Sequence, residues 1–317
     1  MNRQYLASMG FLASVLLLAG VLPAQGDVLY VTSPGTGNGS IQRIDSLSNV
    51  STFASFGAYD RPVGLTFSSV GNLFVSDSIG NGGNPVIYRY DSSGSRSVFT
   101  TAGLLAHPGA LAFNTSGNLY VCNAGANAIL KFDSQGKATA VAGYPDLLSP
   151  NGLALDKSGN LYVADASYNK VEKFDAYGNA SVFANTGLSN PSGVAFDSNG
   201  NLYVSNSANN TVDRFDSQGR GTLFANSGLN EPRGLAFDSS GNLYIANQGD
   251  NTIEKFDPQG HGSLFVSSGL NDPCYLAFAQ VPEPPASILV LVGCALLLYR
   301  PSPFPRLRSL MMVHSRN

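Results

Sequence analysis

The sequence predicts an all-β fold, a six-bladed β-propeller, from a tandem repeat and from the way that repeat begins and ends. A segment of the form apolar-aromatic-apolar, in most copies preceded by Gly-Asn, recurs at intervals of 41 to 46 residues. Its aromatic residue stands at Tyr30, Phe74, Tyr120, Tyr162, Tyr203 and Tyr244. A period in the low forties, with short strands separated by glycine turns, is typical of a propeller blade.

Each unit contains four short stretches that we designate strands A to D. In the last complete unit these are residues 234–237, 242–245, 252–256 and 263–266. Asp, Asn and Gly stand between A and B and between C and D, where they favour tight turns. One four-stranded sheet cannot bury both faces alone, so the blades must stack against each other. We expect the space between blades to be filled by apolar positions such as Leu243, Ile253, Phe256 and Phe265.

The two ends of the repeat predict how the ring closes. The chain begins with strands B, C and D, near Tyr30, Ile41 and Thr52, and it ends with a lone strand A at 275–278. The last strand A is therefore expected to join the first B, C and D in one blade. Residues 27–280 then form six blades of about 42 residues each, within the range for propeller repeats.

The repeat resembles that of the NHL family. The third full unit reads Pro150-Asn151-Gly152-Leu153-Ala154-Leu155-Asp156, then Gly159-Asn160-Leu161-Tyr162-Val163-Ala164-Asp165, then Asn169-Lys170-Val171. The resemblance covers nearly the whole core and implies the six-bladed fold. NHL propellers serve as sensors and binding scaffolds, and related propellers are lyases and lactonases, so the resemblance leaves the function open.

Residues 1–26 are expected to be a secretory signal peptide. A polar start containing Arg3 is followed by an apolar stretch from Phe11 to Leu22 and by Ala24-Gln25-Gly26, a pattern of small residues at a cleavage site. Cleavage before Asp27 is predicted. The alternative is an uncleaved membrane anchor, for which the apolar stretch is short.

Residues 281–317 resemble the PEP-CTERM sorting signal of exported bacterial proteins. Pro282, Glu283 and Pro284 precede an apolar run, Ala286–Tyr299, and scattered arginines. The resemblance implies insertion in the membrane as a transmembrane helix, processing by an exosortase, and a place in the cell envelope or outside the cell. The run is 14 residues long, whereas a span needs about 20, and the tail after Arg300 is long. A generic hydrophobic anchor is the alternative.

The predicted ligand-binding face is the one where loops lead into strand A and leave strand B. One set of polar residues follows strand B, namely Ser33, Asp77, Asn123, Asp165, Asn206 and Asn247. The other set precedes or begins strand A, namely Arg61, His107, Asn151, Asn190, Glu231, Arg233 and Asp272.

The two sets have different interpretations. The first set offers oxygens to a cation such as Ca²⁺ or to sugar hydroxyls. Because it recurs in nearly every blade, turn capping is the favoured interpretation. The second set varies between blades and therefore carries any specificity. Arg61, Arg233, Glu231 and Asp272 form a mixed-charge rim that suits a polar ligand, or else they are ordinary solvated loop charges.

The enzymatic alternative is a metal-dependent lactonase or hydrolase. The gluconolactonase propellers, which are related to the NHL type and share the predicted six-bladed shape, hold a metal with Glu, Asn and Asp side chains. Here only Asn151 matches such a position after a strand-A proline, and Asp165 and Glu231 would have to add oxygens to one divalent cation such as Ca²⁺. Propeller lyases need histidines on the ligand face, where His107 alone is expected. His261 lies in a C–D turn and His314 in the tail.

Composition restricts the partners. Only 12% of residues are charged and the net charge is −3, which argues against a nucleic-acid-binding groove. Cys122 and Cys274 lie in different repeats and are expected to be free thiols. The sequence thus predicts an exported, monomeric, non-catalytic propeller without a cofactor that binds an envelope protein or an exopolysaccharide. A metal-dependent lactonase and a purely structural matrix protein are the alternatives.

Overall fold

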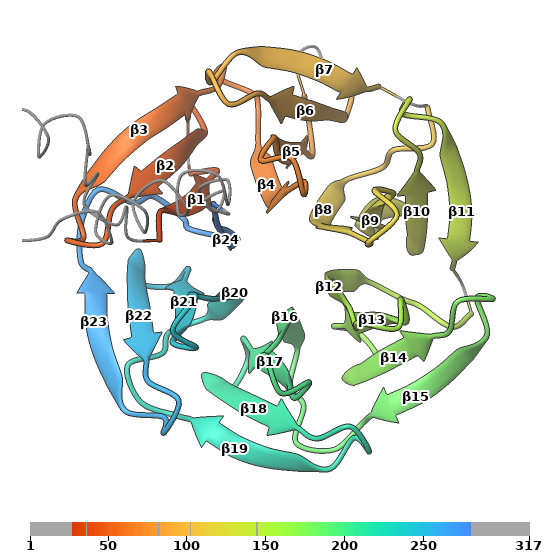
Figure 1. Cartoon of the computed structure of the whole chain (residues 1–317), viewed down its shortest axis with the longest axis vertical. Coiled ribbons are helices and arrows are strands. Elements are labelled where there is room, and N and C mark those ends of the chain that lie inside the picture. The colour runs from red at the N-terminus through yellow and green to blue at the C-terminus, as the bar shows by residue number, and fades with distance from the viewer. Residues whose placement is uncertain (1–26, 36, 81–82, 102, 144, 280–317) are drawn as a thin grey trace, which may run out of the picture. The chain divides into compact units, whose positions relative to one another are not determined.

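The computed structural model describes residues 27–279 apart from 36, 81–82, 102 and 144. These residues form six four-stranded antiparallel sheets arranged as blades of a ring, which confirms the predicted six-bladed propeller (Figure 1). The predicted signal peptide (1–26), the Pro282-Glu283-Pro284 triplet and the apolar run that follows it lie outside the described residues. Among the described residues, no helix has the length and apolar character to cross a membrane.

The strands follow the predicted A-B-C-D order in every blade. In the blade that closes the ring they are β24 (Leu276–Phe278), β1 (Leu29–Ser33), β2 (Ser40–Ile44) and β3 (Val50–Ser55). The next two blades contain β4 (Pro62–Phe67), β5 (Leu73–Asp77), β6 (Val86–Tyr90) and β7 (Arg96–Thr100), then β8 (Pro108–Phe113), β9 (Leu119–Asn123), β10 (Ala128–Phe132) and β11 (Ala138–Ala142).

The remaining three blades have nearly the same strand lengths. The fourth contains β12 (Pro150–Leu155), β13 (Leu161–Asp165), β14 (Lys170–Phe174) and β15 (Ala180–Ala184). The fifth contains β16 (Pro191–Phe196), β17 (Leu202–Asn206), β18 (Thr211–Phe215) and β19 (Gly221–Ala225). The sixth contains β20 (Pro232–Phe237), β21 (Leu243–Asn247), β22 (Thr252–Phe256) and β23 (Gly262–Val266). A short 3₁₀ turn, η1 (Ala124–Ala126), follows β9.

The ring closes as the ends of the repeat predict. β24, the last strand, pairs antiparallel with β1, the first, so that Leu29 lies opposite Phe278 and Val31 opposite Leu276. The first blade is therefore built from both ends of the propeller, next to the second and sixth blades (Figure 1). Opening the ring would separate β24 from β1 and expose the packed faces of that blade.

The core consists of the layers between neighbouring blades. In five of the six layers an aromatic residue of strand B lies edge-on between an aromatic residue of strand D and one of the next blade's strand A. Tyr244, for example, has ring-centroid distances of 4.9 Å to Phe265 and 5.0 Å to Phe278. Such T-shaped pairs add to the burial of apolar area. The predicted core residues Leu243, Ile253 and Phe256 are buried, and Phe265 packs against the cluster that contains Ile253.

The inner strands approach each other closely around the central channel. A Cβ atom added to Gly152 would lie 2.2 Å from the carbonyl oxygen of Ser192, and one added to Gly193 would lie 2.2 Å from that of Arg233. Glycine or alanine therefore occupies the third position of the inner strand in five blades. In the first blade this position is Tyr275, immediately before β24. Its side chain has no equivalent elsewhere in the ring.

Candidate functional site

The polar residues that end each strand B hold in place the loops of the predicted ligand-binding face, which we call the loop face. We call these residues and their hydrogen bonds to the loops the frame. All six, at the ends of β1, β5, β9, β13, β17 and β21, are buried. Each accepts a hydrogen bond from the backbone of the loop that leads into strand A of its own blade. Asn123, for example, accepts through Oδ1 from the Ala106 amide and donates through Nδ2 to the Leu104 carbonyl. These contacts hold two loops of one blade together.

A second set of asparagines ties three of the blades to the blade that follows. Asn169, Asn210 and Asn251 lie in the turns after β13, β17 and β21, with φ of 50°, 58° and 61°. Their side-chain oxygens accept from the amides of Asn190, Glu231 and Asp272, which lie in the loops of the following blade. These residues were not among those predicted for the loop face, although Asn169 belongs to the repeat that resembles the NHL family. Their signal is an asparagine that recurs two positions before the apolar residue of strand C.

The frame presents different side chains on the same backbone geometry. The residue before the proline of strand A has a positive φ in five blades: His107, Ser149, Asn190, Glu231 and Asp272. Non-glycine residues rarely adopt this conformation, and the surrounding contacts must hold it in place. His107, Asn190 and Glu231 are exposed, and Asp272 is partly exposed. Arg61, the equivalent residue of the second blade, is exposed without a positive φ.

Tyr275 crosses the central channel. Its hydroxyl lies 3.0 Å from the backbone oxygen of Asn151 and 3.1 Å from Asn151 Oδ1. Tyr275 precedes β24 in the first blade and Asn151 lies in β12 of the fourth, on the opposite side of the ring (Figure 1). Burial raises the pKa of the Tyr275 hydroxyl, so it stays protonated and can donate. The Tyr275 ring packs against two core layers that are far apart in the sequence.

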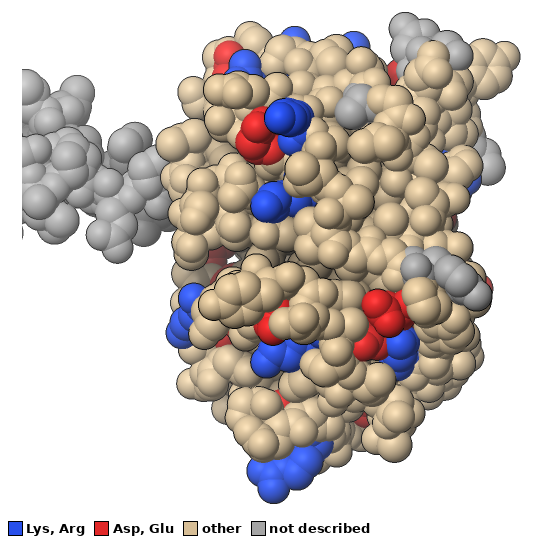
Figure 2. Space-filling model, turned by 90° about the vertical axis from the view of Figure 1, so that its right-hand side faces the viewer, with Lys and Arg blue, Asp and Glu red and all other residues tan. Residues whose placement is uncertain are grey.

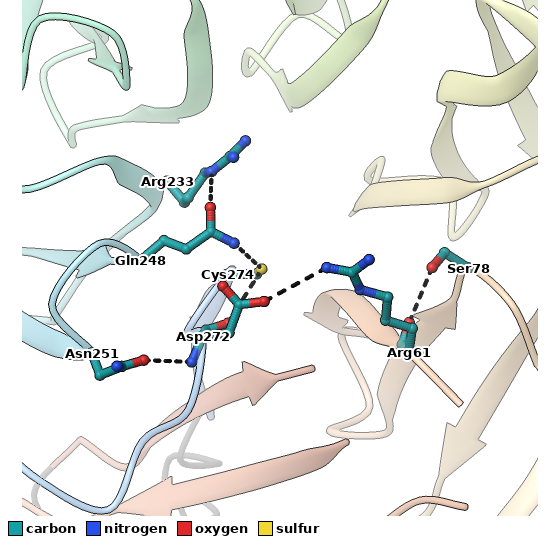
Figure 3. Close-up of polar contacts among 7 residues, drawn as sticks. All are labelled: Arg61, Ser78, Arg233, Gln248, Asn251, Asp272 and Cys274. Atoms are coloured by element: carbon teal, nitrogen blue, oxygen red, sulfur yellow. Dashed lines mark hydrogen bonds and ion pairs between the residues drawn. The ribbon is translucent and has the colours of Figure 1, made fainter. Parts of the chain in front are cut away.

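A chain of polar contacts joins three blades beside Tyr275 (Figure 3). Arg233 Nε donates to Gln248 Oε1 at 2.6 Å, and Gln248 Nε2 lies 3.6 Å from Cys274 Sγ. The Cys274 thiol donates to the Asp272 carbonyl at 3.5 Å. Burial and the nearby Asp272 carboxylate raise the pKa of Cys274 to about 12, which keeps it a thiol. Cys122 and Cys274 are both free, as predicted, and both are buried.

The mixed-charge rim is only partly assembled. Arg61 Nη2 lies 3.6 Å from Asp272 Oδ2, so this pair comes together between the second and first blades (Figure 3). Arg233 connects to the pair through Gln248 and Cys274. The Glu231 carboxylate has no partner among the described residues. The rim therefore has one assembled charge pair, one bridged arginine and one separate carboxylate.

The three residues of the metal alternative have other contacts. Asn151 Oδ1 accepts from Tyr275, and Glu231 is exposed on the loop that leads into β20. The Asp165 oxygens accept from the Leu148 and Tyr168 amides. Over residues 27–279, with the gaps given above, no three or more His, Cys, Asp and Glu side chains form a group able to hold a metal ion. His107 is exposed on the loop face, and His261 is paired with Asp257 in the β22–β23 turn.

Asp77 and Asp165 occupy equivalent positions but differ in hydrogen bonding, which allows a matched test. Asp77 Oδ1 accepts from three amides while its buried Oδ2 has no partner, and burial raises the pKa of Asp77 above its usual 3.8. Asp77→Asn should therefore stabilise the protein at neutral pH, by no more than about 1 kcal/mol, since it removes a buried charge but leaves an amide group without a partner at the Oδ2 position. Urea unfolding measures this difference.

The pH dependence gives the sign of the Asp77 effect. The unfolded chain loses the Asp77 proton at lower pH than the folded chain, so the contribution of Asp77 to the stability of the wild type falls as pH rises above 3.8. The advantage of Asp77→Asn should vanish below that pH. Asp165→Asn is the control, because it removes one of two used acceptors and should destabilise by about 1–3 kcal/mol. Equal effects of the two substitutions at neutral pH would contradict this account.

Comparison with solved structures reveals the same fold in proteins of different function. A chain in the crystal structure of a nidogen/laminin complex has a TM-score of 0.70 and 19% identity, and the match covers 80% of this chain and 99% of that one. A streptogramin B lyase has a TM-score of 0.56 and 20% identity, covering 77% and 75%. A catalytically inactive variant of virginiamycin B lyase from Staphylococcus aureus, with quinupristin, has a TM-score of 0.60 and 17% identity, covering 81% and 94%.

No curated protein matches the sequence. At these levels of identity the structural matches establish the fold alone. The family described as SMP-30/Gluconolactonase/LRE-like region matches residues 87–280, from β6 to the end of the propeller. This match covers more than half of the chain, and the chain therefore belongs to the SMP-30/gluconolactonase/LRE-like family.

Proposed function

We propose that this propeller is a binding module whose ligand contacts the loop face. The supporting observation is that one repeated hydrogen-bonded frame holds different exposed side chains, among them His107, Asn190 and Glu231, in the same backbone conformation. A fixed frame reduces the entropy lost when a ligand orders the loops. Variation confined to the presented side chains allows specificity without disturbing the fold.

The proposed partner is an envelope protein or an exopolysaccharide. Charged residues make up only 12% of the chain. Figure 2, which views the ring from its side, shows a few charged side chains, some of them acidic and basic groups next to each other, on a mostly uncharged surface. Recognition by hydroxyl, amide and aromatic groups suits such a surface better than recognition of a polyanion, which needs clustered basic residues. The structurally similar chain in the nidogen/laminin complex belongs to a protein assembly. It supports the fold's suitability for such a role.

A metal-dependent lactonase or hydrolase is the second candidate, and family membership favours it. Asn151 lies in the inner strand β12, where a bound cation would polarise a carbonyl group or activate water. Asn151 would have to release the Tyr275 hydroxyl to offer its Oδ1 to a metal. The third candidate, a structural matrix protein without a discrete ligand, differs from the first in lacking saturable binding.

The proposal includes export and placement in the cell envelope. It rests on residues 1–26 and on the Pro282-Glu283-Pro284 triplet with the apolar run after it, all read from the sequence. The exosortase-type enzyme that recognises such a signal is the proposed processing partner.

Loop-face substitutions should weaken binding while the matched substitution on the opposite face should not. The double variant Asn190→Ala, Glu231→Ala is expected to bind the envelope protein or exopolysaccharide at least about tenfold more weakly. Losses of this size are typical of residues at the centre of an interface. Tyr177→Ala is the control, since Tyr177 is 91% exposed in the β14–β15 turn. Biosensor titration measures each affinity. Unchanged affinity in the double variant, or equal losses in the control, would contradict a loop-face site.

Metal content separates the binding module from the hydrolase. The purified chain is expected to carry no stoichiometric divalent cation when measured by mass spectrometry. Tyr275→Phe removes the hydroxyl that bonds to Asn151 Oδ1, so the same measurement on this variant tests whether the tyrosine blocks a metal site. About one ion per chain, lost on Asn151→Ala, would favour the hydrolase and direct attention to lactone substrates.

Cell fractionation tests the sorting signal. The wild-type chain is expected to lose its C-terminal segment in a host with an exosortase, which mass spectrometry of the envelope and medium fractions would detect. Glu283→Ala should leave the segment attached and the protein in the membrane fraction. Identical processing of both chains would show that the triplet does not direct sorting.

A further inference from the structure

The loop face contains a pocket at a place where the loops differ from those of the other blades. It has a volume of about 290 Å³ and lies among the loops of the first and second blades. Its lining includes Tyr59, Asp60, Arg61, Ile79 and Asp272. The β5–β6 connection beside it runs over residues 78–85, whereas the equivalent β17–β18 connection has only residues 207–210. This longer connection contributes Ile79.

The polar side of the pocket is positioned by the frame. The Arg61 amide donates to Asp77 Oδ1 at 2.8 Å, and the Arg61 carbonyl accepts from the Ser78 amide at 3.0 Å. The Asp272 amide donates to Asn251 Oδ1 at 2.6 Å. The backbones of both charged residues are therefore held in place by bonds that do not use their charged groups, and the two side chains point toward each other (Figure 3).

The charged groups retain hydrogen-bonding capacity. The 3.6 Å separation between Arg61 Nη2 and Asp272 Oδ2 exceeds that of a good hydrogen bond. The side chains of Arg61 and Asp272 are 52% and 29% exposed. Asp60 is buried and accepts from the Gly57 amide through Oδ2, so its Oδ1 is the oxygen left for a ligand. Donors and acceptors thus stand side by side, the arrangement that two neighbouring hydroxyl groups satisfy by accepting from the arginine and donating to a carboxylate.

The apolar side of the pocket is the ring of Tyr59, which is not packed in the core. Tyr59 is 82% exposed, and within the described residues its ring contacts no other aromatic ring. The negative face of an aromatic ring attracts the weakly positive C–H groups of an apolar surface. Ile79 adds a second apolar contact. A flat molecule with C–H groups on one face and hydroxyls at its edge matches this combination.

The charges select among such molecules. The lining contains one cation, Arg61, and two carboxylates, Asp60 and Asp272, so an anionic sugar meets net repulsion. The pocket is also close to the lower limit of sites for drug-sized ligands, and a single ring occupies less space. We propose that this pocket is a subsite for one neutral pyranose unit of a polysaccharide. The inference rests on the proposed binding function and names its ligand class.

Saturation-transfer NMR and titration of the purified chain test the proposal. The probes are maltose, cellobiose and lactose as neutral sugars, a glucuronate-containing disaccharide as the anionic sugar, and a dipeptide as a zwitterion. At least one neutral disaccharide is expected to bind with millimolar affinity, more tightly than the other two classes. Tyr59→Ala and Arg61→Ala should each weaken binding about tenfold, a typical loss for an anchoring aromatic or arginine.

Matched variants separate recognition from misfolding. Tyr59→Phe keeps the ring and should bind within about twofold of the wild type, because stacking needs the ring and not the hydroxyl. Tyr177→Ala, on the opposite face, should bind like the wild type. Thermal unfolding of each variant checks that the propeller is intact.

The outcomes distinguish this inference from the proposed function. Binding of neutral sugars that is lost with Tyr59→Ala and Arg61→Ala upholds both. Loop-face binding that depends on Asn190 and Glu231 but not on Tyr59 overturns the pyranose subsite and leaves the binding function standing. Preference for the dipeptide or the anionic sugar likewise overturns it, as does the absence of binding to any of the neutral sugars.

Discussion

The structure depends on the inability of a single four-stranded blade to bury both of its faces. Each blade must cover its neighbours, and the cover is complete only when the last blade meets the first. The pairing of β24 with β1 makes that closure part of one sheet, so it is held by backbone hydrogen bonds as well as by packing. The aromatic layers between blades and the glycines of the inner strands then follow as the means of packing a ring around a narrow channel.

Ring closure fixes the position of the loops, and the asparagine and aspartate contacts fix their conformation. Residues that end strand B hold the loop of their own blade, while Asn169, Asn210 and Asn251 reach the next one. Polar groups that would otherwise be open to a ligand are thereby engaged in the frame. The groups left for recognition are those that the frame presents, such as Glu231 and Arg61. On the loop face, the polar residues that recur in each blade thus fix the loops, and the residues that vary between blades are left to contact a ligand.

In the central channel, one residue changes which polar groups are open to a ligand. Tyr275 replaces the small residue found in the other five inner strands and bonds to Asn151 across the ring. Asn151 is the residue that the resemblance to gluconolactonase-like propellers implies as a metal ligand. Its side-chain oxygen is occupied by the Tyr275 hydroxyl. A ligand therefore finds unoccupied polar groups away from Asn151, in the pocket at Tyr59 and Arg61.

The sequence by itself determined the number of blades, the strand order, the closing blade and the core positions, because all four are written in a local pattern that repeats. It also located the residues of the loop face, since the ends of strands can be counted. It did not reveal that Tyr275 reaches Asn151 or that Arg61 meets Asp272. These pairs are 124 and 211 residues apart along the chain. Only ring closure, which sets the distance between blades, brought them together, and no local pattern contains that distance.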